Sequence, residues 1–303
     1  MHTSVLLNES IEYLNLKKNS IIVDCTLGYG GHSTKILENI PNGFLYAFDQ
    51  DKEAIKYASE RLKGVGINFE IINTNFKNIK KEIIKRCDKV DGILFDLGVS
   101  SPQLDNAERG FSFHKDAPLD MRMNRDSDIS AKEVVNTYSY DELTNIFYKY
   151  GEEKYSSSIA RGIINYRLDK EIESTLELAE IIKANVPEKY RREGHPARKV
   201  FQAIRIYVND ELNVFERALR DSLDLLNPGG RICVITFHSL EDRICKNIFK
   251  EISSIPKELN KLPIIPDEYK PKFKVIANIV PSKEEIRNNK RSRSARLRVI
   301  ERG

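Results

Sequence analysis

The residues best suited to chemistry lie in a glycine-rich stretch near the start of the chain, Asp24-Cys-Thr-Leu-Gly-Tyr-Gly-Gly-His-Ser. Glycine at three of these positions lets the backbone approach a ligand closely and adopt positive φ angles. The dinucleotide fingerprint G-x-G-x-x-G would need a further glycine where Ser33 stands, and no G-x-x-x-x-G-K-[ST] phosphate loop is present. The stretch therefore supports pyrophosphate binding only weakly, and a tight turn of an α/β protein is the alternative interpretation.

Acidic residues follow three short apolar runs, at Asp24, Asp49 and Asp96. A carboxylate at the end of the second strand, as Asp49 would be, can accept hydrogen bonds from both hydroxyls of a ribose. A glycine loop with two acids and no pyrophosphate signature fits the adenosine and amino-acid ends of S-adenosylmethionine. The loop alone predicts such a site with moderate specificity.

The apolar runs indicate which elements would position these acids. Four runs are predicted to be strands: 21–25, 44–48, 69–72 and 90–95. Residues 51–62 carry the apolar stripe of a helix, and Ser33 is predicted to cap another helix that carries Ile36 and Leu37. Strands that alternate with helices imply right-handed crossovers and a parallel sheet, at whose carboxyl edge ligands bind.

The strand pattern resumes only after more than a hundred residues. A helix over 211–226, a tight turn at Asn227-Pro-Gly-Gly and a buried strand over 231–237 are predicted there. The interval contains three S-x-x-E capping boxes: Ser130/Glu133, Ser139/Glu142 and Ser174/Glu177. A loop this long without structure of its own is improbable, so we expect a helical domain inserted over 106–199, between a first part at 1–105 and a second part at 200–303.

The end of the chain is predicted to add two more strands. Residues 246–267 contain several prolines and are predicted to be an irregular excursion, and the last strands, over 274–280 and 295–300, are expected to form an antiparallel pair. Within the last of these, Arg296 and Arg298 have the spacing of side chains that face out together.

The net charge of +4 is less informative than its distribution. Residues 283–303 carry eight basic and three acidic side chains, and residues 188–205 carry six basic and two acidic side chains. Two basic segments on an otherwise acidic chain are what a phosphate-binding surface requires. The alternative is two solvated faces that neutralise acidic neighbours.

Composition excludes several other classes of protein. The four cysteines show no CxxC spacing and the five histidines are scattered, so neither a disulfide framework nor a metal site is expected, and the cysteines should pack as small hydrophobes. The longest apolar run, 232–237, is far shorter than the ~20 residues that span a bilayer. The amino terminus lacks the features of a signal peptide, so a cytoplasmic protein with reduced thiols is expected.

Several short sequence motifs together resemble the bacterial ribosomal RNA small subunit methyltransferase H family (RsmH, also called MraW). The motifs occur in the order of the family along nearly the whole chain. They are His2-Thr-Ser-Val-Leu-Leu-Asn-Glu, the Asp24 stretch, Phe95-Asp-Leu-Gly-Val-Ser-Ser-Pro-Gln-Leu-Asp, Glu108-Arg-Gly-Phe-Ser-Phe, Pro118-Leu-Asp-Met-Arg-Met, Phe201-Gln-Ala-Ile-Arg-Ile, Val208-Asn-Asp-Glu-Leu, Phe237-His-Ser-Leu-Glu-Asp-Arg and Arg293-Ser-Ala-Arg-Leu-Arg. The resemblance implies a class I, Rossmann-like methyltransferase sheet with an inserted helical domain for substrate recognition. It also implies methylation of the exocyclic N4 of a cytosine in the decoding (P-site) region of 16S ribosomal RNA, with S-adenosyl-L-methionine as cofactor. The implied partner is the small ribosomal subunit, and a homodimer is compatible with the family.

The same resemblance implies roles for individual residues. Those implied to bind the methyl donor are Gly30, Gly31, His32, Asp49, Phe76, Asp96 and Gln103. Phe76 has the alternative role of a core aromatic, and His32 that of a helix-start residue satisfied by the backbone.

The target amine is a poor nucleophile, so we expect Asp96, or a carbonyl near residues 100–102, to accept a hydrogen bond from it. We expect His238 and Ser239 to lie near the incoming base, although Ser239-x-x-Asp242 could instead be a simple capping box. The residues expected to contact RNA are Arg205, His238, Ser239, Arg296 and Arg298.

Three other functions compete with this interpretation. A nicotinamide dehydrogenase fits the strand-end acids but fails at Ser33. A methyltransferase that acts on another RNA, on a protein or on a small molecule would keep the donor site, and among these the basic segments favour RNA. A non-catalytic RNA-binding module would not need a complete donor site.

Overall fold

The computed structural model describes residues 4–255, 266 and 269–303, and the chain divides into two compact units. The first, here the sheet unit, comprises Met1–Gly98 and Leu212–Gly303. The second, here the helical unit, is Val99–Glu211. The segment predicted as the insertion, 106–199, lies inside the helical unit, whose bounds are wider at both ends.

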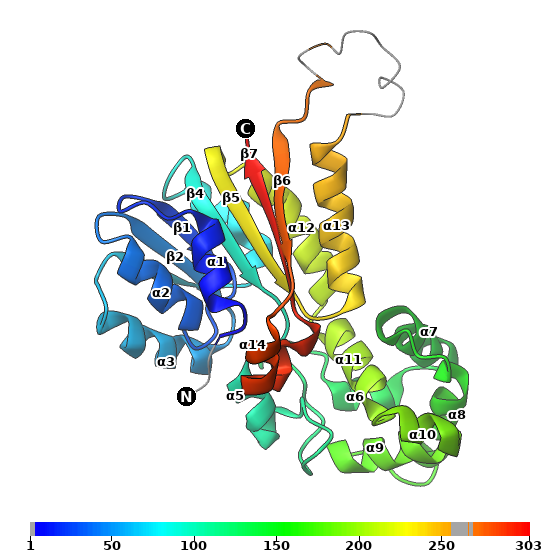
Figure 1. Cartoon of the computed structure of the whole chain (residues 1–303). Helices are drawn as coiled ribbons and strands as arrows, with labels where there is room; N and C mark the ends of the chain where they lie inside the picture. Colours follow the sequence, from blue (N-terminus) through cyan, green and yellow to red (C-terminus); the bar gives the residue numbers. More distant parts are fainter. Residues whose placement is uncertain (1–3, 256–265, 267–268) are drawn as a thin grey trace. The chain divides into compact units, whose positions relative to one another are not determined.

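A seven-stranded sheet with the order β3-β2-β1-β4-β5-β7-β6 forms the centre of the sheet unit (Figure 1). Its strands are β1 (Ile21–Asp24), β2 (Phe44–Asp49), β3 (Phe69–Asn73), β4 (Val90–Asp96), β5 (Leu226–Thr236), β6 (Phe273–Ile279) and β7 (Arg296–Arg302). The first five pair in parallel, whereas β7 runs antiparallel to both β5 and β6. The predicted α/β class and the antiparallel final pair are therefore confirmed.

Helices cover both faces of this sheet, as a parallel sheet requires. They are α1 (Leu7–Leu14), α2 (Gly31–Asn39), α3 (Lys52–Lys63), α4 (Ile79–Ile84), α12 (Glu211–Leu223) and α13 (Ser239–Ser253). A further helix, α14 (Lys283–Asn288), follows β6 and has no buried residue. Successive residues of β4 point to opposite faces: Phe95 is buried with Phe215 of α12, and Leu94 with Ile36 of α2. Both clusters consist of buried, mainly apolar side chains, so burial on two sides fixes the register of the central strands.

Three local predictions in the sheet unit are wrong. Ser33 does not cap α2, because the helix begins at Gly31 with Gly30 as its N-cap, and the Ser33 hydroxyl donates to the Asp24 carboxylate instead. The predicted turn at 227–230 lies within β5, where the pairing with β4 shifts register. The predicted excursion over 246–267 is helical as far as Ser253, because the prolines that suggested it begin only at Pro256; residues 256–265 and 267–268 lie outside the described residues.

The helical unit has a core of its own. Its helices are α5 (Ser101–Asp105), α6 (Ala131–Thr137), α7 (Tyr140–Gly151), α8 (Ser156–Arg167), α9 (Thr175–Ala184), α10 (Glu188–Glu193) and α11 (Ala197–Val208). Ser130, Ser139 and Ser174 each accept a hydrogen bond from the backbone N–H of the glutamate three residues later, which confirms the three predicted helix starts. The unit extends beyond residue 199 because Phe201 and Ile204 of α11 are buried in this core.

The cysteines and the helix hydropathies complete the description of the fold. All four cysteines are free thiols, and Cys25, Cys233 and Cys245 are buried among apolar side chains, as predicted. Burial raises the pKa of the Cys25 thiol well above its ordinary value, so it packs as a neutral group. Among the described helices, none has the length and hydropathy needed to cross a lipid bilayer.

Candidate active site

The glycine-rich loop joins the end of β1 to the start of α2, at the carboxyl edge of the sheet. Gly30 has a φ of +77°, which a residue with a Cβ adopts only at a cost, and it forms the N-cap of α2. A Cβ added at Gly31 would lie 1.9 Å from Oγ of Ser4, so a side chain there would displace the Ser4 hydroxyl. The loop is anchored to β2, because the Leu27 N–H donates to the Phe48 carbonyl at 2.9 Å.

Asp49 lies at the end of β2 and holds the loop from one side. Its Oδ2 accepts a hydrogen bond from the Gly28 N–H and its Oδ1 accepts one from the Asp51 N–H, both at 2.8 Å. Burial raises the pKa of the Asp49 carboxyl to about 6. The Gln50 backbone also bonds to this carboxylate. A carboxylate has about four lone-pair sites, so Asp49 keeps capacity for a further hydrogen bond from a ligand.

Asp24, at the end of β1, is fully buried and serves the loop internally. Its carboxylate accepts hydrogen bonds from the Thr26 N–H at 3.0 Å and the Ser33 hydroxyl at 2.7 Å. Burial raises the pKa of Asp24 above its ordinary value. This strand-end acid therefore ties β1 to α2 rather than facing a ligand.

Asp96, at the end of β4, lies beside His32. Nδ1 of His32 is 3.4 Å from Oδ2 of Asp96, and the backbone N–H of Asp96 donates to Oγ1 of Thr26 at 2.7 Å. The other carboxylate oxygen, Oδ1, is buried and has no hydrogen-bond partner among the described residues. Burial lowers the pKa of His32, but the contacts with Asp96, Asp24 and the Val5 backbone together raise it overall.

Phe76 begins a short 3₁₀ helix, Phe76–Asn78, that follows β3. Its ring packs edge-on against Phe95, with 5.7 Å between the centroids, and it remains partly exposed. Phe76 is therefore at the rim of the core, where one part of the ring packs inward and the rest can meet a ligand.

Gln103 lies in the helical unit, in the first turn of α5. It forms a capping box with Ser100: the Ser100 N–H donates to Oε1 of Gln103, and the Gln103 N–H donates to the Ser100 hydroxyl. The side chain is buried. Capping is therefore its observed structural role, and its role toward the donor stays a prediction.

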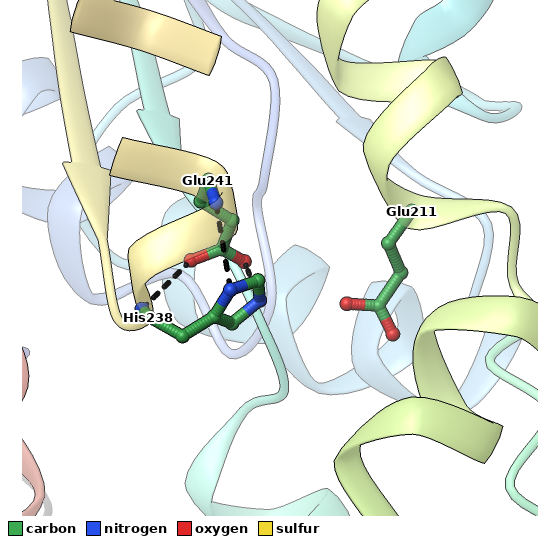
Figure 2. Close-up of side chains that lie close together, drawn as sticks. All are labelled: Glu211, His238 and Glu241. Atoms are coloured by element: carbon green, nitrogen blue, oxygen red, sulfur yellow. Dashed lines mark hydrogen bonds and ion pairs between the residues drawn. The ribbon is translucent and has the colours of Figure 1, made fainter. Parts of the chain in front are cut away.

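His238 is the N-cap of α13 (Figure 2). Its Nδ1 accepts a hydrogen bond from the Glu241 N–H at 3.4 Å, and its Nε2 lies 3.1 Å from Oε1 of Glu241. Oε2 of Glu241 accepts from the N–H groups of Phe237 and His238, at 2.7 and 3.3 Å. The capping box thus begins at His238, one residue before the predicted Ser239-x-x-Asp242 box, and Ser239 is exposed in the first turn.

The arginines expected to contact RNA are engaged with carboxylates. In the helical unit, Arg205 makes a bidentate pair with Glu211, with both contacts at 2.9 Å. In the sheet unit, Arg298 makes a bidentate pair with Asp242 at 2.7 and 3.0 Å and is 13% exposed. Arg296 is 37% exposed and lies 3.8 Å from the same carboxylate. The prediction that Arg296 and Arg298 face out together is wrong for Arg298, because the guanidinium of Arg298 is paired with Asp242 of α13.

The model of the MraW methylase family matches residues 1–303, the whole chain. The chain belongs to the MraW methylase family. This methylase uses S-adenosylmethionine as its methyl donor, and its sheet is that of the class I methyltransferases.

The solved structures similar to this methylase share little sequence with it. An rRNA methylase from Streptococcus thermophilus is 13% identical with a TM-score of 0.46, and the match covers 100% of this chain and 99% of that one. SMU.1697c from Streptococcus mutans, solved in complex with SAH, is also 13% identical with a TM-score of 0.46 and full coverage of both chains. TrmN from Thermus thermophilus is 12% identical with a TM-score of 0.43, over 98% of this chain and 48% of that one.

Two residues beside the strand-end acids and the glycine-rich loop of this methylase are absent from the predicted site. Thr26 connects two strand-end acids, because its N–H donates to Asp24 and its hydroxyl accepts from the Asp96 N–H. Ser4 packs against Gly31 from the other end of the sequence. The position of Thr26, two residues after Asp24, was a usable signal, since a side-chain hydroxyl next to a strand-end acid often bonds to it. The sequence carries no signal that would bring Ser4 to the loop.

Proposed function

We propose that this methylase transfers a methyl group to the exocyclic N4 of a cytosine in the decoding (P-site) region of 16S ribosomal RNA. Membership of the MraW methylase family supports methyl transfer. The rRNA methylase from Streptococcus thermophilus, to which the chain is similar in fold, agrees with ribosomal RNA as the substrate class. The observation that carries the proposal is Oδ1 of Asp96, a buried acceptor at the edge of the sheet with no partner among the described residues.

The residues of the loop fit the donor. Asp49 would accept a hydrogen bond from the ribose with the capacity that its backbone contacts leave free. The loop at Gly30 and Gly31 would let the donor approach the backbone. The exposed part of Phe76 would cover the adenine. When bound, S-adenosylmethionine supplies an electrophilic methyl group on a sulfonium centre.

Asp96 is proposed to act on the target amine. The lone pair of the cytosine amine is delocalised into the ring, which makes the amine a weak nucleophile. A carboxylate that accepts one N–H of the amine turns the lone pair toward the methyl group and holds the amine in place. Fixing the reactants in a near-attack geometry can lower the barrier by about 7–11 kcal/mol.

The substrate must present an unstacked base, because a base within a helix cannot reach the edge of the sheet. We infer that the helical unit and the basic C-terminal segment hold the surrounding RNA and that the partner is the small ribosomal subunit in the cytoplasm. His238, Ser239 and Arg205 remain candidates for contacts to this RNA, and a homodimer remains compatible with the proposal.

Methylation assays with the full chain test the proposal. Tritiated S-adenosylmethionine is supplied with either isolated small-subunit particles or free 16S RNA, and the product is digested and identified as a nucleoside. We expect N4-methylcytidine, and we expect Asp96→Ala to lower the rate at saturating donor by at least tenfold. A label on another atom, on a protein, or an Asp96→Ala rate near that of the wild type would overturn it.

A further inference from the structure

His32 is a buried imidazole whose ring faces the strand-end acids. It lies in the first turn of α2 and is 5% exposed. Its Nδ1 is 3.4 Å from Oδ2 of Asp96, whereas its Nε2 is buried without a hydrogen-bond partner in the described part of the chain. A buried polar ring is costly unless it is hydrogen-bonded, so its contact with Asp96 needs an explanation beyond the filling of space.

Asp96 is fixed at its backbone and at one carboxylate oxygen. The Asp96 N–H donates to Oγ1 of Thr26, and that hydroxyl also lies 3.4 Å from Oδ1 of Asp24, as a donor. His32 contacts Oδ2 of Asp96. Only Oδ1 of Asp96 is left without a partner among the described residues, although it too is buried.

Three groups from three parts of the sheet unit act on the His32 ring. Asp96 faces it from the end of β4, Asp24 from the end of β1, and the Val5 carbonyl from the segment before α1. All three are negative or have a negative end, so they favour the protonated imidazole. Burial opposes protonation, but these groups together raise the pKa of His32 overall. The geometry lets Nδ1 of His32 donate to Oδ2 of Asp96, a contact that strengthens when the imidazole is protonated.

We propose that His32 is a positioning residue for Asp96: it holds Oδ2, so that the partly exposed carboxylate keeps one orientation toward the amine of the substrate. This inference rests on the proposed function of Asp96. It gives His32 a role through a neighbouring side chain, which differs from the direct donor contact that the family resemblance implies. Without His32 the carboxylate would rotate about its Cβ–Cγ bond, and the free oxygen would lose its fixed direction.

A pair of substitutions separates positioning from packing. The side-chain amide of His32→Asn can place an N–H near the position of Nδ1, whereas His32→Leu keeps the bulk and donates nothing. We expect His32→Leu to lower kcat roughly 10- to 100-fold, with the dissociation constant of S-adenosylmethionine, measured by calorimetry, changed less than threefold. We expect His32→Asn to recover most of the lost kcat.

A titration followed by NMR supplies a readout that needs neither donor nor RNA. The His32 signal is assigned as the imidazole resonance that disappears in His32→Asn, and its pKa is compared between the wild type and Asp96→Asn. We expect the pKa of His32 to fall by about one pH unit or more in Asp96→Asn, because the opposite charge is removed. The melting temperature of each variant shows whether it is folded.

The possible results distinguish the inference from the function on which it rests. An unshifted His32 titration in Asp96→Asn, or equal kcat values for His32→Leu and His32→Asn, would overturn the positioning role even if the product is N4-methylcytidine. A weakened donor affinity in His32→Leu with unchanged kcat would also overturn it, in favour of the direct donor contact. If the wild type methylates another atom, the proposed function fails while the coupling of the two side chains can still be read from the titration.

Discussion

The three acids that end strands β1, β2 and β4 have different surroundings and therefore different roles. Asp24 is fully buried and accepts hydrogen bonds from Thr26 and Ser33, so it stabilises the loop. Asp49 accepts hydrogen bonds from the backbone of Gly28, Asp51 and Gln50, which leaves part of its acceptor capacity for a ligand. Asp96 has one oxygen held by His32 and one without a partner among the described residues. Three acids at equivalent strand-end positions thus differ in role: Asp24 is structural, Asp49 is proposed to bind the donor, and Asp96 is proposed to contact the substrate.

The raised pKa of Asp49 predicts how donor affinity depends on pH. Its carboxyl has a pKa of about 6, so it is mostly neutral at pH 5 and mostly ionised at pH 7.5. The ionised form accepts hydrogen bonds from the ribose hydroxyls better than the neutral acid, so affinity should rise with pH. We expect S-adenosylmethionine to bind about tenfold more weakly at pH 5 than at pH 7.5, as measured by calorimetry.

Asp49→Asn is the matched control for this titration, since it keeps the shape but cannot ionise. Its donor affinity should be weak and nearly independent of pH over the same range. A pH dependence that persists in Asp49→Asn would assign the effect to another group.

Two neighbouring glycines should respond differently to the same substitution. Gly30→Ala forces a Cβ onto a φ of +77°, which we expect to lower the free energy of unfolding by about 1–2 kcal/mol in urea titrations. Gly31→Ala places its Cβ 1.9 Å from Oγ of Ser4, so its cost should be largely relieved in the double variant with Ser4→Ala. Relief of Gly30→Ala by Ser4→Ala would contradict this assignment, because the strain at Gly30 is in its own backbone.

At the scale of the element, the start of α13 combines a structural and a proposed functional role in His238. Asn also caps helices well, whereas Ala does not. We expect His238→Ala to lower the free energy of unfolding by about 1 kcal/mol, and His238→Asn to stay close to the wild type. Lys250→Ala, an exposed change in the last turn of the same helix, is the control for the loss of side-chain bulk.

The same pair of variants tests whether His238 also contacts the incoming base. If it does, His238→Asn keeps its stability but loses methylation rate at subsaturating RNA. A His238→Asn protein with normal methylation at all RNA concentrations would leave capping as the only role of this residue.

The sequence predicted elements well where periodicity and burial agree. The strands around Val23, Phe48 and Phe95 were found because residues buried on both faces give short continuous apolar runs. The prediction that Ser33 caps α2 is wrong because Gly30 itself forms the N-cap of the helix. The Ser33 hydroxyl can therefore donate to Asp24. The side chain of Arg298 could not be placed from its strand period, because its partner Asp242 is on a helix distant in sequence.

The sequence also predicted part of the candidate site, because that part is formed by residues close together in the sequence or at strand ends. Its loop and its acids are local in sequence, and the positions of Asp49 and Asp96 at strand ends follow from the topology. The contact between His32 and Asp96 was not predicted, since it depends on which side of α2 faces β4. Sequence spacing identifies residues that reach an edge of a sheet, but side-chain packing decides which of them touch.

At the scale of the whole molecule, charge is the property that bears on the substrate. The chain has a net charge of +4, and its C-terminal segment from residue 283 to 303 is strongly basic. Within that segment the described structure separates two kinds of arginine. Arg298 is held by Asp242, whose pKa it lowers although burial opposes this, whereas Arg287 and Arg293 are exposed. Exposed cations are the ones able to replace counterions on RNA without first breaking an ion pair.

Salt titrations of RNA binding by the full chain can therefore locate the phosphate contacts. Each lost phosphate contact lowers the slope of log K against log salt by roughly 0.7–0.9. We expect the double variant Arg287→Gln and Arg293→Gln to flatten the slope by about 1–2, with donor affinity unchanged. Arg298→Gln should instead leave the slope near that of the wild type and lower the free energy of unfolding, because it leaves Asp242 without its bidentate partner. A slope flattened by Arg298→Gln but not by the double variant would show that RNA displaces Asp242 from Arg298, and would move the phosphate contacts onto strand β7.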